Sequence, residues 1–190
     1  MSKPIYQKNV ASRTLFIWLG FSTVLWLNFG VAYFTHPQAW ASAVEFQRQT
    51  GWAVLETILA SNSLLLLLII TGNLFVRFGA ITPGLIILVI QAVSIGWTAG
   101  TNSFLEPFTS VAQANAAFFR IGLWETTAYA VMCAVTLPKS LLVSDTFPVQ
   151  KWVEQKAFKD LTFTCSELVI ATTGMLCLIG AAYVEAFIPI

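Results

Sequence analysis

Five long apolar stretches dominate this chain and limit the folds open to it. They cover about residues 14–34, 53–76, 83–99, 118–137 and 161–188. An α-helix rises about 1.5 Å per residue, so about 20 apolar residues span the roughly 30 Å hydrocarbon core of a bilayer. Only 10% of the residues are charged, against roughly 25% in soluble proteins. We therefore expect an all-α membrane protein in which residues 1–190 form a single bundle of about five transmembrane helices.

Flanking residues indicate where several of these helices begin and end. The first run is longer than the roughly 7–15 apolar residues of a secretory signal, so we expect it to be retained as a helix. Thr82 is a favourable N-cap for the third helix, and Pro83 is a favourable first residue. The fourth run has the weakest pattern, because Arg120 and Glu125 fall within its first two turns. Pro138 ends that run.

The connector between the fourth and fifth runs has the pattern of a helix that lies in the headgroup region. Residues 148–160 place Trp152, Val153 and Phe158 among lysine, glutamate and glutamine residues. Such a pattern favours an amphipathic helix along the membrane surface. A solvated linker with a few apolar residues is the alternative. The bundle is therefore expected to carry one or two interfacial helices.

Lysine and arginine are divided unequally between the two ends of the expected bundle. With five crossings, eight of the ten lie on the side of the N-terminus, and Arg48 and Arg120 lie on the other. Positive residues are enriched in cytoplasmic loops, so we expect a cytoplasmic N-terminus and an outside C-terminus in a bacterial-type inner membrane. Four tryptophans then fall near the outer interface, as in an aromatic belt: Trp40, Trp52, Trp97 and Trp124.

Glutamates within apolar helices are the main candidates for function, because ionisable groups are costly in a bilayer. Glu56, Glu125 and Glu185 would lie on three helices at a similar depth, roughly 5–10 Å below the outer boundary. Facing the interior, they would form a carboxylate cluster that handles protons or cations, or that docks a basic partner. Otherwise each glutamate reaches water, or pairs with Arg48 or Arg120 and only fixes the packing.

Three amide side chains also fall inside the apolar runs, and Glu167 lies near the inner end of the last one. Asn62, Asn73 and Gln91 are expected to hydrogen-bond across helices, which contributes about 0.6–2 kcal/mol each. Asn62 is in addition a candidate functional or docking residue, because it belongs to one of the motifs described below.

Ala92, Gly96 and Gly100 recur every four residues on one face of the third helix. Small residues at this spacing let a second helix approach closely. We therefore expect a helix-packing face here. The sequence leaves open whether the second helix belongs to this chain or to another one.

Three segments from about residue 55 to the C-terminus form an ordered set of motifs. They are Asn62 in an Asn-containing stretch before a leucine run and Gly72, Glu125 in a Gly-x-x-Glu-x-x-Ala pattern, and Glu185 in an Ala-x-x-Glu-Ala-Phe ending. This set resembles the stage II sporulation protein M family of integral membrane proteins.

The resemblance implies a membrane-embedded helical fold. The family takes its name from a bacterial engulfment protein that anchors cell-wall hydrolases at a membrane without being a hydrolase itself. Two sites depart from the family pattern. Arg120 and Ile121 stand where the family commonly has Pro-His, and Gln91 and Ala92 stand where it commonly has Asn-Gly. A family role that depends on that histidine is therefore not carried over.

Motifs of the common enzyme classes are missing from the sequence. It contains no Gly-x-Ser-x-Gly, phosphate loop or paired-histidine motif, and His36 is the only histidine. We therefore expect no cofactor and no metal, and the net charge of +1 does not indicate a nucleic acid. We expect a non-enzymatic scaffold or accessory subunit that contacts membrane lipids and a membrane-protein partner or a second copy. The alternative is a permease or channel component that uses buried carboxylates, and an intramembrane enzyme comes third.

Overall fold

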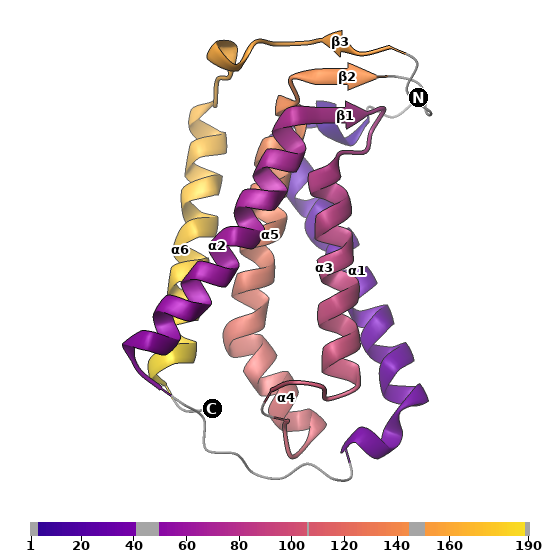
Figure 1. Ribbon diagram of the computed structural model, residues 1–190, viewed down its shortest axis with the longest axis vertical. Helices are drawn as coiled ribbons and strands as arrows, with labels where there is room; N and C mark the ends of the chain where they lie inside the picture. The colour runs from indigo at the N-terminus through magenta and orange to yellow at the C-terminus, as the bar shows by residue number, and fades with distance from the viewer. Residues whose placement is uncertain (1–3, 41–49, 106, 145–150, 189–190) are drawn as a thin grey trace.

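A computed structural model describes residues 4–40, 50–105, 107–144 and 151–188. They form an elongated bundle of helices with a small sheet across one end (Figure 1). Four helices are long and apolar enough to cross a membrane: α1 (Val10–Thr35), α2 (Trp52–Phe75), α3 (Pro83–Gly100) and α6 (Cys165–Phe187). This agrees with the predicted helical membrane fold.

The fourth predicted helix, at residues 118–137, is built from several pieces. They are α4 (Val111–Ala117), the π-helical turn η3 (Phe118–Gly122), α5 (Leu123–Thr136) and the closing 3-10 turn η4 (Leu137–Lys139). The helical path starts earlier than predicted because the Ser110 hydroxyl accepts a hydrogen bond from the amide of Gln113 at 3.2 Å, which caps α4. Pro138 lies in η4, where the helix was predicted to end.

α5 is the central helix of the bundle, and α1, α2 and α6 all pack against it. Small side chains such as Ala128 and Cys133 are completely buried on it. In α2, by contrast, only Leu66, Ile69 and Asn73 are buried. Because most of α5 is buried against other helices, its sequence has less need of a continuous apolar surface than the outer helices have.

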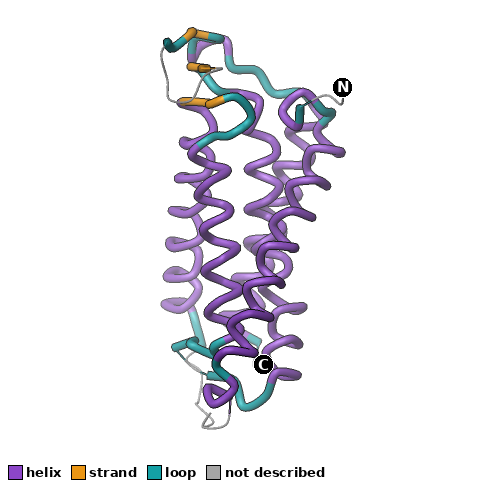
Figure 2. The backbone as a smooth tube through the Cα atoms, turned by 90° about the vertical axis from the view of Figure 1, so that its right-hand side faces the viewer, coloured by secondary structure: helices purple, strands orange, loops and turns teal. Residues whose placement is uncertain are grey.

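Successive helices run in alternating directions (Figures 1 and 2). α1 therefore begins at the sheet end, and α6 ends at the opposite end. Short 3-10 turns, η1 (Ile5–Gln7) and η2 (Pro37–Trp40), flank α1. α2 and α3 lie close together at the sheet end and diverge toward the other end (Figure 1).

The small-residue face of α3 packs against α1 of the same chain. A Cβ atom added at Gly96 would overlap the carbonyl oxygen of Leu25, and one added at Gly100 would lie 2.5 Å from that of Phe29. Ala92 is fully buried on the same face. The predicted helix-packing face is therefore used within the chain, which answers the question that the sequence left open.

A three-stranded sheet covers one end of the bundle, and the all-α prediction missed it. β1 (Val76–Phe78) follows α2 directly and pairs in parallel with β2 (Leu142–Ser144), which pairs antiparallel with β3 (Val153–Glu154). Each strand has two or three residues. Strands this short carry no alternation of polar and apolar residues that a sequence pattern can reveal.

The interfacial helix predicted over residues 148–160 is wrong for the part that the structure describes, which starts at Lys151; the residues before it lie outside the described part. β3 and the 3-10 turn η5 (Phe158–Asp160) occupy this part instead. The amide of Gln155 donates to the carbonyl of Leu141 at 2.8 Å. Pairing with β2 satisfies main-chain groups that a helix would have paired internally.

Basic residues gather at the sheet end of the bundle. Those that the structure describes there are Lys8, Arg13, Arg77, Lys139, Lys151, Lys156 and Lys159. Arg120 lies in η3, near the other end, and Lys3 and Arg48 are outside the described residues. The unequal distribution of charge along the sequence therefore corresponds to an unequal distribution in space.

Candidate functional site

Asn62 links α2 to α5 through a carboxylate and a phenol. Its Nδ2 donates to Oε1 of Glu125 at 2.7 Å, and its Oδ1 accepts from the hydroxyl of Tyr129 at 2.7 Å. Glu125 and Tyr129 are four residues apart on α5, so their side chains share one face of that helix. The amide of Asn62 is thus oriented by both contacts and holds Glu125 in place.

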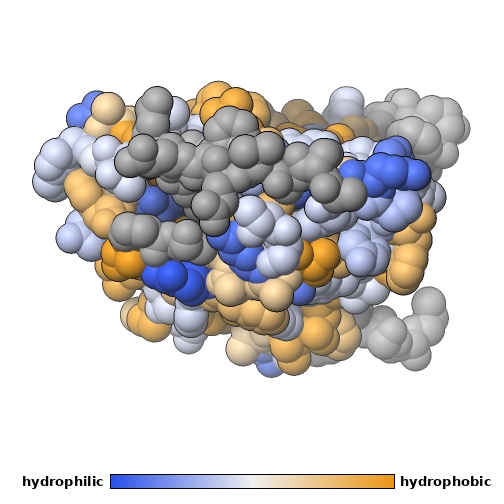
Figure 3. Space-filling model, turned by 90° about the horizontal axis from the view of Figure 1, so that it is seen from below, coloured by the Kyte–Doolittle hydropathy of each residue, from blue (hydrophilic) through white to orange (hydrophobic). Residues whose placement is uncertain are grey.

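These groups line a cavity of about 290 Å³ between the helices. It lies toward the end away from the sheet, where α2 and α3 diverge (Figure 1). Seen from that end, hydrophilic residues are exposed between hydrophobic ones (Figure 3). The polar side chains of the lining are Asn62, Gln91, Asn115, Glu125, Thr126, Tyr129 and Glu185. Three of the predicted candidates, Asn62, Glu125 and Glu185, therefore meet at one cavity.

Aromatic rings form another part of the cavity lining. Trp26 from α1 packs edge to face on Phe118 from η3, with ring centroids 5.3 Å apart, and on Phe29, with centroids 5.4 Å apart. Phe104 and Phe108, from the loop after α3, form a second pair with centroids 5.1 Å apart. The cavity thus combines carboxylates with several aromatic rings.

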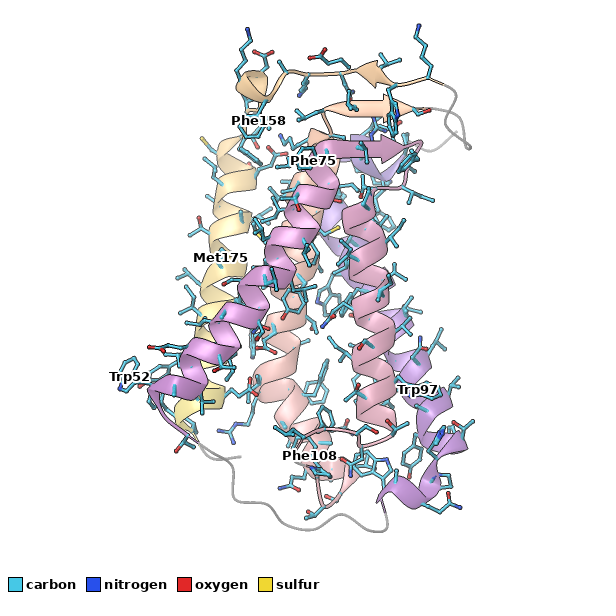
Figure 4. All side chains as sticks on the ribbon, in the orientation of Figure 1. Trp52, Phe75, Trp97, Phe108, Phe158 and Met175 are labelled. Atoms are coloured by element: carbon cyan, nitrogen blue, oxygen red, sulfur yellow. The ribbon has the colours of Figure 1, made fainter. Side chains whose placement is uncertain are left out.

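The loop that carries Phe108 is fixed by Asn102. The side chain of Asn102 donates to the carbonyl of Phe108 and accepts from its amide, both at 2.9 Å. Asn102 has a positive φ of 51°, a conformation that asparagine tolerates better than most residues. These contacts hold Phe108 at the end of the bundle near α4 (Figure 4).

The π-helical turn η3 lies directly beside the cavity. Phe118, Ile121 and Gly122 from this turn line the cavity, and Glu125 follows one turn later. A Cβ atom at Gly122 would lie 2.8 Å from Cδ2 of Phe118, so glycine makes room for that ring. π-helical turns within α-helices often occur at functional sites.

The interior beyond Tyr129, toward the sheet, is filled by side chains. Tyr129 is 3% exposed, and Ile69, Cys133 and Leu137 are fully buried. On α5 the cavity lining reaches no further than Tyr129. Among the described residues, the lining of this cavity thus stops at Tyr129 on α5, and buried apolar side chains follow it toward the sheet.

Asn73 forms a second polar contact between helices, in this filled part. Its Nδ2 donates to the hydroxyl oxygen of Thr136 at 2.8 Å and to the carbonyl of Cys133 at 3.1 Å, and its Oδ1 accepts from Thr82. Its backbone carbonyl accepts from the hydroxyl of Ser140 at 2.7 Å. The interhelical hydrogen bonding predicted for Asn62 and Asn73 is thus present, and Asn73 joins α2, α5 and the start of α3.

Near the sheet, Glu167 pairs with two buried cations. Its Oε1 lies 3.3 Å from Nη2 of Arg13, and its Oε2 lies 2.7 Å from Nζ of Lys139. Arg13 also donates from Nε to the carbonyl of Ala134. The exposed fractions are 3% for Arg13, 8% for Lys139 and 6% for Glu167. This ion triad joins α1, η4 and α6.

The triad was not predicted from the sequence, because Arg13 and Lys139 were considered only as charges that set the orientation in the membrane. The sequence does contain one indication that Glu167 has a structural role. Thr164 and Glu167 have the spacing of a capping box, and in the structure each side chain accepts from the other's backbone amide. Tyr129 was missed as well, although its spacing from Glu125 places both on one helix face.

Glu56 does not join the other candidate glutamates. It is exposed on α2 and is not part of the cavity lining. Arg120, one of its predicted partners, is exposed on η3, and Arg48 lies outside the described residues. Within the part of the chain that the structure describes, no three His, Cys, Asp or Glu residues are grouped so as to hold a metal ion.

Comparisons with known proteins supply no family for this chain. No protein family model, curated protein or solved structure matches it.

Proposed function

We propose that this protein is a non-enzymatic integral membrane scaffold or accessory subunit of a larger membrane assembly. In this proposal α1, α2, α3, the α4–α5 unit and α6 each cross the membrane, with a cytoplasmic N-terminus and an outside C-terminus. The concentration of basic residues at the sheet end supports that orientation. The alternation of helix directions places the start of α1 and the end of α6 at opposite ends of the bundle, as an odd number of crossings requires (Figure 1).

The scaffold proposal is carried by the tightly packed half of the bundle, which lies between Tyr129 and the sheet. There the Asn73 contacts and the ion triad of Arg13, Lys139 and Glu167 tie the helices together around fully buried apolar side chains. Alternating access in a transporter requires such helices to move against one another. Breaking buried polar contacts to do so would be costly, so the packing favours a static role.

The outer surface of the bundle suits contacts with lipid or with a partner helix. Leu27 on α1, Leu64 on α2 and Leu176 on α6 are 64%, 59% and 64% exposed. We expect membrane lipids to cover most of this surface and a membrane-protein partner or a second copy to cover the rest.

Membership of the stage II sporulation protein M family is part of the same proposal. The three motif residues of that resemblance, Asn62, Glu125 and Glu185, all line one cavity. A shared site gives a physical reason for three motifs far apart in sequence to occur together. The engulfment protein for which the family is named anchors hydrolases at a membrane, which is the kind of role that we propose for this chain.

Isolation of the intact protein in mild detergent, followed by mass spectrometry of what stays bound, tests this function. We expect a membrane-protein partner in a fixed ratio to this chain, absent from a parallel preparation of an unrelated helical membrane protein with the same tag. Recovery of this chain alone, together with activity of the isolated protein, would contradict a scaffold or accessory role.

A permease or channel component is the second candidate, and the presence of Glu125 and Glu185 at one cavity favours it. It predicts that Glu125→Gln abolishes flux of a cation or proton in proteoliposomes while the fold is kept. Glu56→Gln is the matched control, because Glu56 lies outside the cavity lining. Equal flux in the wild type and the Glu125→Gln variant would argue against transport through this site.

A further inference from the structure

The cavity has a lining that is acidic and aromatic at the same time. Its ionisable acids are Glu125 and Glu185, and none of the described residues that line it is lysine, arginine or histidine. An anionic ligand beside Glu125 would therefore meet a carboxylate, and none of the described lining residues offers it a basic side chain. The carboxylate of Glu125 favours a cation instead.

The aromatic rings of the lining indicate which class of cation fits the cavity. Trp26, Phe29 and Phe118 meet edge to face on one part of the lining. The face of an aromatic ring attracts an ammonium group, most strongly for tryptophan, and the attraction grows when the ion is desolvated. Aromatic rings with a carboxylate nearby suit an organic ammonium ion, whose methyl or methylene groups pack on the rings.

A bound metal ion fits the lining less well. Hard cations such as Ca²⁺ and Mg²⁺ take about six or more oxygen ligands, usually several of them carboxylates. The described residues contain no group of three His, Cys, Asp or Glu that could hold such an ion. Most of the remaining lining is aromatic or aliphatic, and it offers little to a small hydrated ion.

The size of the cavity and the way Glu125 is held also fit a small organic ligand. The volume of about 290 Å³ is near the lower limit of roughly 300 Å³ for small-molecule sites. Asn62 fixes Oε1 of Glu125 with a hydrogen bond of 2.7 Å. That contact uses one of the two carboxylate oxygens and orients the group before a ligand arrives, which lowers the cost of binding.

We propose that this cavity binds an organic ammonium ion, with the charged nitrogen at Glu125 and the apolar groups against Trp26, Phe29 and Phe118. The ion is either a free amine or quaternary ammonium compound, or the ammonium headgroup of a lipid. This inference goes beyond the scaffold function and does not depend on it.

Binding of choline to the full-length protein tests the proposal. The protein is placed in nanodiscs of phosphatidylglycerol, which contain no ammonium lipid, and radiolabelled choline is titrated. The matched neutral probe is 3,3-dimethylbutanol, which has the same shape without the charge. We expect saturable binding of choline, with the neutral probe competing at least about tenfold more weakly, a factor that corresponds to about 1.4 kcal/mol.

Two variants test whether choline binds at this cavity or elsewhere on the protein. Glu125→Gln keeps the shape of the side chain and removes its charge, so we expect choline affinity to fall about tenfold or more. Glu56→Gln, outside the cavity lining, is expected to leave it unchanged. The Glu125→Gln variant is used only if it elutes as a folded, monodisperse protein. If it does not, the proposal is tested by comparing the binding of choline and of the neutral probe to the wild-type protein.

Analysis of bound lipids distinguishes a free ammonium compound from the headgroup of a lipid. Lipids are extracted from wild-type protein purified from membranes that contain phosphatidylethanolamine and phosphatidylglycerol. Retention of phosphatidylethanolamine that is lost in the Glu125→Gln variant, without choline binding, identifies a lipid headgroup as the ligand. Equal affinity for choline and the neutral probe overturns the proposal. So does the absence of both choline binding and selective lipid retention.

Discussion

Glu167 balances two buried positive charges at the sheet end of the bundle. It lies between Arg13 and Lys139 and also accepts from the backbone amide of Thr164 at 3.0 Å. One carboxylate therefore serves three donors from separate parts of the chain. In a region where all three charged groups are nearly buried, each depends on the others for its stability.

Replacing Glu167 by glutamine is expected to destabilise the protein strongly. The change leaves Arg13 and Lys139 buried without a counter-charge, which typically costs about 3–5 kcal/mol. The measurement is the free energy of unfolding in detergent, followed by circular dichroism against denaturant. Glu154→Gln is the control, because Glu154 is exposed in β3. If both variants unfold like the wild type, the triad does not stabilise this end of the bundle.

At the residue scale, the sequence identified polar groups but not which of them meet. Asn62, Glu125 and Glu185 were selected because polar groups are costly inside apolar runs. Glu56 satisfied the same criterion and yet is exposed on α2. The difference lies in the rotation of each helix about its axis, which places one glutamate on an interior face and another on an outer face.

At the scale of elements, the contact between α1 and α3 depends on backbone approaching backbone. Gly96 and Gly100 on α3 lie against the carbonyl groups of Leu25 and Phe29 on α1. A backbone obstacle cannot rotate away as a flexible side chain can. Any larger residue at these positions must therefore push the two helices apart.

A Gly96→Leu substitution is expected to destabilise the bundle by about 2 kcal/mol or more, since overpacking a tight contact costs roughly 1–3 kcal/mol. Gly180→Leu introduces the same residue on α6 at an open position, with nothing within 4 Å of an added Cβ. Thermal unfolding in detergent should show a lower midpoint for Gly96→Leu and little change for Gly180→Leu. Similar midpoints for both variants would contradict a close contact between α1 and α3.

Local signals predicted the ends of elements well where a capping residue was present. Thr82 was expected to cap α3, and its hydroxyl accepts from the amide of Leu85 at 3.1 Å. The predicted helix at residues 118–137 starts at Val111 instead and contains the π-helical turn η3. No local signal such as a capping residue or proline marks that turn in the sequence.

At the scale of the whole molecule, the distribution of charge predicts a testable orientation. With a cytoplasmic sheet end, residue 159 should be inaccessible from outside an intact cell, and residue 109, at the other end, should be accessible. Thr109→Cys and Lys159→Cys, each made in a Cys165→Ser background because Cys165 is exposed, are treated with a membrane-impermeant maleimide. Labelling of Thr109→Cys alone in intact cells is expected.

Inside-out vesicles provide the control for that experiment, since they should reverse the labelling. Labelling of Lys159→Cys but not of Thr109→Cys in intact cells would contradict the proposed orientation. Labelling of both, or of neither, in sealed cells would contradict an odd number of crossings between the two positions. The result is independent of whether the cavity binds a ligand.

The sequence by itself determined the membrane-type helical fold, most helix boundaries and the unequal charge of the two ends. These properties depend on hydropathy, length and capping, which are local. The tertiary structure decided that Asn62, Glu125 and Glu185 share a cavity with Trp26, and that a small sheet covers one end. Those outcomes depend on how each helix is rotated and packed against its neighbours, and no local pattern specifies that.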